Sequence, residues 1–173
     1  MLIRKARAED GLACFALRNA AILTGCKGFY EDELLELWTE GECPSWFLHV
    51  VATEFYVLEI AGRILATGFI DLNLAKLEAL FVHPEVMRTG VGKAMYLYLE
   101  SLAISHGLKE IRLESTINAA PFYRSLGFGG SGLERNSVYH SPKGFNLPCI
   151  EMHKPLGDAR LTERSAVIAI NSS

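Results

Sequence analysis

The chain has 173 residues, half of them hydrophobic, and a formal net charge of −3. This length and composition predict one domain with one core, and the near-neutral charge without a basic stripe argues against a nucleic-acid partner. No apolar run approaches the roughly 20 residues that span a bilayer, and none follows the first charged residues as in a signal peptide. We therefore expect a cytoplasmic protein with no membrane partner. The four cysteines and five histidines are dispersed without the spacing of a zinc module, which predicts reduced thiols and no metal.

The first part of the chain predicts a short strand and two helices. Residues 2–6 favour the strand, and apolar residues recur at helical spacing between Leu12 and Leu23. A second helix opens on the acidic residues at 31–33 and ends at Gly41.

Strand-like runs follow at 47–51, 55–60, 63–72 and 77–82. Ala61-Gly62 stands between the second and the third of these runs, which is typical of a hairpin. The run at 47–51 is short and its limits are ambiguous, whereas the run at 55–60 is strongly β-prone.

The second half of the chain predicts a long helix, a strand, a short helix and two antiparallel strands. The long helix begins after a glycine-bearing loop at 88–92, and its apolar residues have helical spacing. A strand starts at Ile111, a short helix covers 118–126, and strands at 138–140 and 147–153 come last.

These elements predict an α/β (α+β) fold, a mixed sheet with helices packed on its faces. The sequence contains no repeat, no low-complexity segment and no linker. We therefore predict a single domain over residues 1–156. Residues 157–173, which are polar and then apolar at 167–170, form a tail to which the sequence assigns no role.

The most informative segment runs from the strand at 77–82 through the glycine loop into the long helix. Free N–H groups at a helix start, beside the positive end of the helix dipole, form an anion site that commonly binds phosphate. A P-loop would require glycine at position 87 and Ser or Thr at 94, but the chain has Met87 and Ala94. A dinucleotide-binding loop would require glycine where the chain has Met95. Both failures argue against an ATP- or NAD-binding enzyme.

A third pattern fits this segment. Val82-His83-Pro84 followed by Gly90-Val91-Gly92 resembles the pyrophosphate loop of the GNAT-superfamily N-acetyltransferases, [QR]xxGx[GA] after a strand that ends in V-x-P. Met87 departs from this pattern, because the family usually has Gln or Arg there, and Arg88 is the nearest replacement for that charge. From the loop alone, a glycine turn without a ligand stays open as an alternative.

A second segment carries the same resemblance. Asn118, Phe122-Tyr123 and Gly127-Phe128 resemble the other marker of the family and stand at the matching distance from the loop. The resemblance spans about residues 2–156 and implies a mostly antiparallel sheet of six to seven strands, with helices on both faces and two splayed central strands.

The resemblance further implies an acetyl-CoA-dependent N-acetyltransferase whose partners are the coenzyme A thioester and an amine of a small molecule or protein. A non-catalytic module that binds or senses acyl-CoA on the same fold is the alternative. A homodimer is a possible assembly by the same resemblance.

The family's coenzyme contacts can be carried over to individual residues. The pantetheine arm is expected in the gap between the splayed strands, and the glycine loop is expected to hold the pyrophosphate. The contacts implied in this way are Leu80, Phe81, Val82, Met87, Arg88, Thr89, Gly90, Val91, Gly92, Lys93, Asn118 and Tyr123.

The resemblance also suggests which residues carry out the chemistry. A backbone N–H near Val82 is expected to hold the thioester oxygen, and the hydroxyl of Tyr123 to protonate the departing thiolate. The alternative for Tyr123 is a packing role beside Phe122. Glu78 is the first candidate for the general base, because a carboxylate within an otherwise apolar strand suggests a functional role. The alternative for Glu78 is an ordinary position that faces solvent. Glu114 is the second candidate for the base.

The acceptor side carries less information. In this family the first two helices and the last hairpin usually shape it, which here means residues 25–46 and 135–146. Six acidic residues between Glu31 and Glu42 suggest attraction of a cationic amine, or alternatively a solvated helix face that the helix dipole favours. The sequence names no acceptor.

Overall fold

The computed structural model describes residues 1–157 of the chain. Most of the tail proposed from sequence, residues 158–173 with the apolar stretch at 167–170, lies outside the described residues. The helices and strands follow one another as β1 (Leu2–Lys5), the 3-10 turn η1 (Ala8–Asp10), α1 (Gly11–Gly25), α2 (Asp32–Thr39), α3 (Ser45–Glu54), β2 (Tyr56–Ile60), β3 (Arg63–Asp71), β4 (Lys76–Val82), η2 (Pro84–Val86), α4 (Val91–Ser105), β5 (Glu110–Thr116), α5 (Ala120–Ser125), β6 (Glu134–His140) and β7 (Asn146–Pro155).

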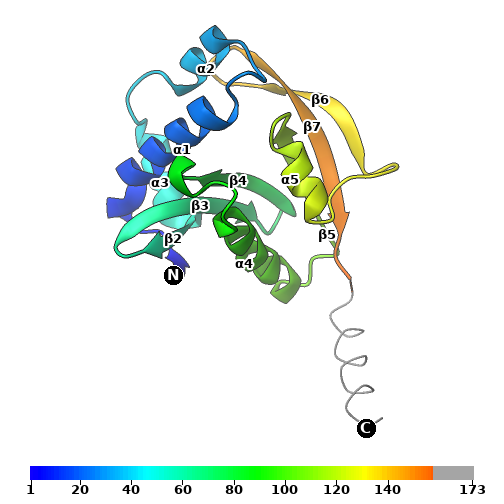
Figure 1. The fold of residues 1–173 in the computed structure, drawn as a ribbon. Coiled ribbons are helices and arrows are strands. Elements are labelled where there is room, and N and C mark those ends of the chain that lie inside the picture. The colour runs from blue at the N-terminus through cyan, green and yellow to red at the C-terminus, as the bar shows by residue number, and fades with distance from the viewer. Residues whose placement is uncertain (158–173) are drawn as a thin grey trace.

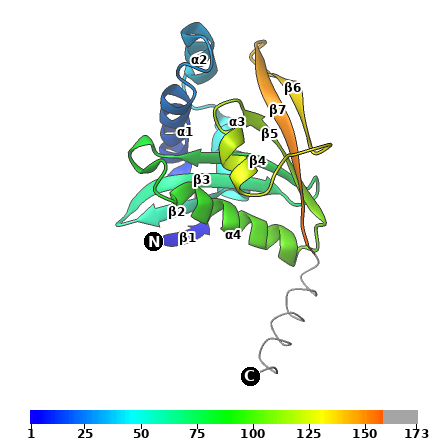
Figure 2. The ribbon, with the colours of Figure 1, turned by 45° about the vertical axis from the view of Figure 1, so that its right-hand side comes forward.

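The strands form one seven-stranded sheet in the order β1-β2-β3-β4-β5-β7-β6. Neighbouring strands run antiparallel, except β4 and β5, which are parallel. Helices α4 and α5 pack on one face of the sheet, and α1 and α3 pack on the other (Figures 1 and 2). The predicted mixed, mostly antiparallel sheet with helices on both faces is confirmed.

The strand predicted at 47–51 is wrong, because these residues lie within helix α3. Phe47 and Val51 are one helical turn apart and are both buried against Cys14 and Phe55. The run looks like a buried strand because it is short and apolar, and periodicity alone does not separate a buried strand from a buried helix. Packing against α1 stabilises the helical conformation of these residues over a strand.

The two central strands separate along most of their length. In the described chain one residue pair, Lys76 with Arg112, joins β4 to β5 at the start of both strands. The N–H of Arg112 also donates to the carbonyl of Ala75 at 2.9 Å. Beyond this point the strands diverge, so residues 79–82 stay partly exposed although β4 lies in the middle of the sheet. The predicted splay of the central strands is thus observed.

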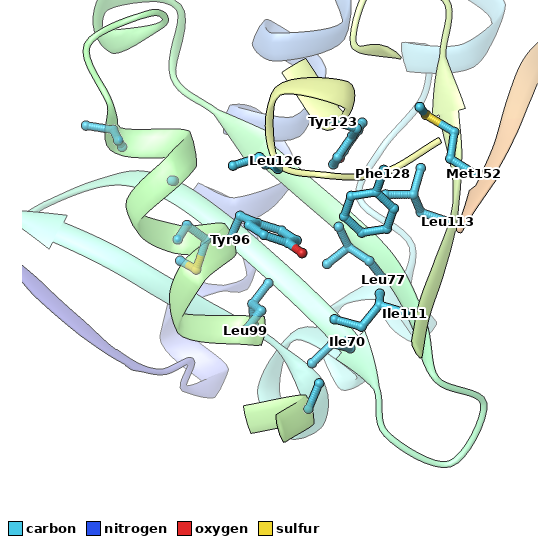
Figure 3. Close-up of a cluster of buried hydrophobic side chains, with 14 of the residues drawn as sticks. Ile70, Leu77, Tyr96, Leu99, Ile111, Leu113, Tyr123, Leu126, Phe128 and Met152 are labelled. Atoms are coloured by element: carbon cyan, nitrogen blue, oxygen red, sulfur yellow. The ribbon is translucent and has the colours of Figure 1, made fainter. Parts of the chain in front are cut away.

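Helix α4 packs close to the sheet because β3 contains a glycine beneath it. A Cβ atom on Gly68 would lie 2.7 Å from Cδ1 of Leu99 and 3.2 Å from the carbonyl oxygen of Ala79. Both the helix and the neighbouring strand would have to move to accept a side chain there. Figure 3 shows the resulting core, in which Tyr96 and Leu99 of α4 lie beside Leu77 and Ile111 of the central strands. This packing places the start of α4 next to the carboxyl end of β4.

The described helices include none that is both long and apolar enough to cross a bilayer.

Candidate active site

The loop between β4 and α4 forms a cradle of backbone N–H groups. Gly90 adopts φ +94°, in the left-handed region that glycine tolerates, and α4 begins at the next residue. Five backbone N–H groups of this loop have no hydrogen-bond acceptor within residues 1–157: those of Arg88, Gly90, Val91, Gly92 and Lys93. Free donors at the start of a 15-residue helix, together with the helix dipole, fit a pyrophosphate group.

The side chains of this loop surround the cradle. Arg88, Thr89 and Lys93 are exposed, and Arg88 forms no ion pair with a described residue. The Thr89 hydroxyl donates to the carbonyl of Val86 at 2.7 Å, which holds the turn. Met87 points elsewhere: its Cε lies 3.7 Å from the Cβ position that a side chain on Gly25 would take. Met87 therefore packs toward the end of α1, and Arg88 is the residue beside it that offers a free positive charge.

The edge of β4 that faces the gap carries unpaired backbone groups. The N–H of His83 donates to the carbonyl of Leu65 on the β3 side at 2.8 Å. Backbone N–H groups point alternately to the two sides of a strand. The N–H of Phe81 therefore also points toward β3, whereas the N–H groups of Leu80 and Val82 point into the gap. The gap thus offers backbone partners at Leu80 and Val82, while Phe81 contributes a side chain that packs beside Ile22 and Leu35.

Tyr123 lies in α5, on the face of the sheet that α4 covers. Its side chain is buried, and its ring packs edge-on against Phe122 at 5.2 Å and Phe128 at 5.7 Å between centroids (Figure 3). No described residue forms a hydrogen bond with its hydroxyl. Burial raises the pKa of the Tyr123 phenol above the ordinary value of 10.0. The hydroxyl therefore keeps its proton throughout the neutral range.

Asn118 follows β5 and reaches across to the end of α1. Its Oδ1 accepts a hydrogen bond from the Cys26 thiol at 3.3 Å. Burial raises the pKa of that thiol to about 11, so Cys26 is protonated and able to donate. The amide nitrogen of Asn118 has no hydrogen-bond partner within residues 1–157, so it is the part of the side chain that is free to bind a ligand.

The two candidate bases, Glu78 and Glu114, share one ammonium group. The Nζ of Lys76 lies 3.1 Å from Oε2 of Glu78 and 3.0 Å from Oε2 of Glu114. Burial opposes the charge of Lys76, but hydrogen bonds from Lys76 to Glu114 and Glu78 outweigh burial and raise its pKa. Both carboxylates are partly open to solvent, with side-chain exposures of 30% and 32%.

Glu78 also has a structural reason for its position in β4. Phe69 pairs with Ala79 and Ile70 pairs with Leu77, which leaves Glu78 as the extra residue of a β-bulge. The bulge and the Lys76 ion pair explain a carboxylate in this strand without a catalytic role. Glu78 precedes Leu80, whose N–H faces the gap, by two residues.

An open pocket of about 250 Å³ lies at the closed end of the gap. Its walls carry mostly charged side chains: Lys76, Arg112, Leu113, Glu114, Arg135 and Glu151. Arg112 and Glu114 alternate along β5 with Ile111 and Leu113, which pack in the core under α4. The pocket therefore opens on the opposite face of the sheet from α4.

Sequence reasoning reached Glu114 but missed Lys76, Arg112, Arg135 and Glu151. The signal was present in the period-two alternation of charged and apolar residues in β5, which puts Arg112 and Glu114 on one face. The sequence does not show that β5 and β7 pair with Glu114 opposite Glu151.

Across residues 1–157 no group of three or more His, Cys, Asp or Glu side chains is arranged to hold a metal ion. All four cysteines lie in this part of the chain and are free thiols.

A cradle of free N–H groups at the end of an unpaired strand edge has the form expected for binding a long phosphate-bearing coenzyme. Residues 31–139 match the family model described as an acetyltransferase (GNAT) domain. This match covers more than half of the chain, and the chain belongs to the GNAT acetyltransferase family. By this membership it is an N-acetyltransferase that takes its acetyl group from acetyl-CoA, which favours the enzyme over the non-catalytic module.

Solved structures of similar fold agree with this assignment. A GCN5-related N-acetyltransferase from Rhodopseudomonas palustris superposes with a TM-score of 0.81 at 20% identity, over 90% of this chain and 95% of its own. The PaiA N-acetyltransferase of Thermoplasma acidophilum, solved in complex with coenzyme A, gives 0.67 at 19% identity, over 90% and 98%. The ribosomal-protein-S18-alanine N-acetyltransferase of Escherichia coli gives 0.58 at 21% identity, over 91% and 97%. At these identities the likeness shows a common fold.

Proposed function

We propose that the enzyme transfers the acetyl group to a primary amine of a small molecule or protein by direct attack, with both substrates bound at once. The observation that carries this proposal is the free N–H cradle continuing into the unpaired edge of β4, with the protonated Tyr123 on the same side of the sheet as α4. No covalent enzyme intermediate is needed, because the amine approaches from the opposite face.

In this proposal the glycine loop and the gap between β4 and β5 bind two parts of coenzyme A, the pyrophosphate and the pantetheine arm. The free N–H groups of Arg88 and of residues 90–93, with the Arg88 side chain, hold the pyrophosphate. The backbone of Leu80 and Val82 pairs with the amides of the pantetheine arm, and the free amide of Asn118 binds the same arm. A Cβ on Gly92 would lie 3.0 Å from Cγ2 of Val82, so glycine keeps this junction open.

The reaction then forms one C–N bond and breaks one C–S bond. A neutral amine nitrogen attacks the thioester carbonyl carbon, and a backbone N–H on the gap edge of β4 stabilises the negative charge that develops on the oxygen. Tyr123 donates its hydroxyl proton to the departing sulfur, and the base removes one proton from the amine. The products are the acetylated amine and the free thiol of coenzyme A. Proton exchange with solvent restores Tyr123 and the base.

Glu78 is the proposed base, acting directly or through a water molecule. The bulge places it beside the residues whose N–H groups line the gap. Glu114 is the second candidate, because it lines the acceptor-side pocket and contacts the same ammonium group as Glu78.

Substitutions at these two positions separate the candidates. We expect Glu78→Gln to lower kcat/KM at pH 7 by about tenfold or more, because the amide cannot take the proton from the attacking amine. Glu114→Gln should lower kcat/KM by less than about threefold, since this substitution weakens only the binding of the amine. Steady-state thiol release across pH 5–9 measures both variants. A larger loss in Glu114→Gln transfers the role to Glu114.

The proposed function has a direct test. Purified enzyme should bind acetyl-CoA in a calorimeter and release free thiol when amino acids, polyamines, aminoglycosides or N-terminal peptides are added. Arg88→Gln should weaken acetyl-CoA binding about tenfold by removing one charge-assisted contact to the pyrophosphate. Absence of coenzyme binding contradicts the site, and binding without turnover of any amine contradicts the transfer reaction.

A further inference from the structure

The pocket at the closed end of the gap has a positive end and a negative end. At the negative end, Lys76 is shared by the two carboxylates of Glu78 and Glu114, so within residues 1–157 one of the two negative charges has no counter-ion. On the neighbouring strand, Glu151 has its own cation, because Arg135 contacts its Oε2 at 2.6 Å. This cation lets Glu151 sit directly opposite Glu114 in the sheet, an arrangement that like charges otherwise disfavour.

The positive end is Arg112. No described carboxylate forms an ion pair with it, although Glu114 and Glu151 line the same pocket. Within residues 1–157 the Arg112 guanidinium makes one long hydrogen bond, from Nε to the carbonyl oxygen of Leu74 at 3.4 Å. The two terminal nitrogens are left for a ligand, and a guanidinium presents them as a fork that matches a carboxylate.

The distance between the two ends sets the size of a ligand. Arg112 and Glu114 are two residues apart on β5 and face the same way, which corresponds to about 7 Å along a strand. The negative end is nearer to the reacting carbonyl, because Glu114 and Glu78 lie between Arg112 and the open part of the gap. A ligand that spans the pocket therefore carries its amine toward the gap and its anionic group about 7 Å away.

Hydrogen bonds join the segment between α1 and α2 to the last hairpin. The Tyr30 hydroxyl accepts from the N–H of Ile117 at 2.9 Å and donates to the carbonyl of Pro148 at 2.8 Å. The Lys143 ammonium donates to the carbonyls of Leu37 and Glu40 at 3.2 and 2.8 Å, at the end of α2. If an extended polypeptide were to lie between these two segments, the hydrogen bonds would have to break, which favours a small acceptor in the charged pocket.

We propose that the acceptor is a small amine that also carries a carboxylate, with the amine beside Glu78 and Glu114 and the carboxylate held by Arg112. This assignment rests on the proposed function and adds a substrate class to it. The acidic residues around the start of α2 play no part in it: Glu31 at the N-cap and Asp32, Glu33 and Glu36 within the helix are exposed to solvent.

Matched acceptors test the assignment. Thiol release is measured with glycine, β-alanine, 4-aminobutyrate and 6-aminohexanoate, each against its amide, and with butylamine. We expect kcat/KM to favour the acid over its amide by about tenfold or more at the best chain length, since only the acid forms a charge-assisted pair with Arg112. The best length should be one of the two longer acids, which match a separation of about 7 Å.

Variants of Arg112 test the residue itself. Arg112→Gln should bring the acid-to-amide ratio to about one by raising KM for the acid, and should leave butylamine turnover and calorimetric acetyl-CoA binding unchanged. Arg112→Lys keeps the charge without the fork and should retain part of the preference. Arg7→Gln is the control, because its guanidinium is exposed and pairs with Glu9 away from the pocket.

The outcomes separate the two proposals. Equal use of acids and amides, or a preference that survives Arg112→Gln, overturns the carboxylated acceptor and leaves the acetyl transfer standing. Preference for a peptide amine over every small acid also overturns it. Failure to acetylate any amine, by protein that binds acetyl-CoA, overturns the proposed function and this assignment with it.

Discussion

Replacing Tyr123 by phenylalanine should lower kcat about tenfold or more while acetyl-CoA binds with unchanged affinity. The substitution removes one hydroxyl and keeps the ring, so the contacts with Phe122 and Phe128 persist. Since no described residue forms a hydrogen bond with that hydroxyl, its loss leaves no buried donor or acceptor unpaired. The folded state should therefore be as stable as before, and the loss should fall on the protonation of the leaving group.

The pH dependence gives a second measurement on the same residue. Burial raises the pKa of Tyr123 above 10.0, so the donor stays protonated at every pH below that value. We expect kcat of the native enzyme to show no decline from loss of this proton below about pH 10.

Tyr98→Phe is the matched control for Tyr123→Phe. Tyr98 lies on α4, and its ring packs against Tyr56 at 5.2 Å, away from the gap between the central strands. Its substitution should leave kcat within about twofold of native. Native kcat in Tyr123→Phe, measured by thiol release at saturating acetyl-CoA, removes the proton-donor role and leaves Tyr123 as a packing residue.

The second large effect concerns stability. Asp10→Asn should lower the free energy of unfolding by about 3 kcal/mol. Asp10 is 7% exposed, and its carboxylate accepts from both terminal nitrogens of Arg4, at 2.7 and 3.1 Å, and from the N–H of Arg7 at 2.8 Å. The amide leaves the Arg4 guanidinium with Glu59 as its remaining carboxylate partner among the described residues. Urea denaturation at pH 7 measures the change.

The sign of the pH effect follows from the pKa of Asp10. The hydrogen bond from Arg4 is its largest perturbation and lowers the pKa in the folded state below the ordinary value of 3.8. The charged pair therefore stabilises the fold fully above pH 3.8, and this contribution is lost as pH falls through the lower folded value. The stability difference between the native protein and Asp10→Asn should be constant above about pH 5 and shrink below pH 3.8.

Glu9→Gln is the control for Asp10→Asn. Glu9 is the neighbouring acid, its side chain is 70% exposed, and its pair with Arg7 is long, at 3.7 Å. The expected change is within about 0.5 kcal/mol. Equal effects of the two substitutions contradict the special role of the buried carboxylate.

Local signals in the sequence were sufficient for most of the fold. The helices α1, α2 and α4 and the hairpin of β2 and β3 follow from periodicity and turn residues, which act within a few residues of one another. Helix α3 did not follow, because Phe47 and Val51 take their conformation from packing against Cys14 of α1, far away in the sequence. Tertiary packing overrides propensity in such short apolar segments.

The residues of the proposed site were foreseen to different extents in the same way. The glycine loop and the Phe122-Tyr123 pair were recognisable because their residue types and spacing are local. The splay of β4 and β5 was expected only from the resemblance to the family. The structure shows how far it extends, because the pairing of the two strands stops after Lys76 and Arg112. The bulge at Glu78 was not foreseen, because a bulge depends on the register with β3.

By itself the sequence determined the class of protein: a mixed, mostly antiparallel fold and a family of acetyl-CoA-dependent acetyltransferases, recognised through two motifs. Only the tertiary structure decided which charges meet. Lys76, Glu78, Glu114, Arg112 and Glu151 come from three strands, and their pairing follows from strand order and register. Coulomb interactions and hydrogen bonds act over a few ångströms. The folded chain, and not the spacing along it, therefore leaves Arg112 without a carboxylate partner among the described residues and gives the proposed acceptor pocket its two ends.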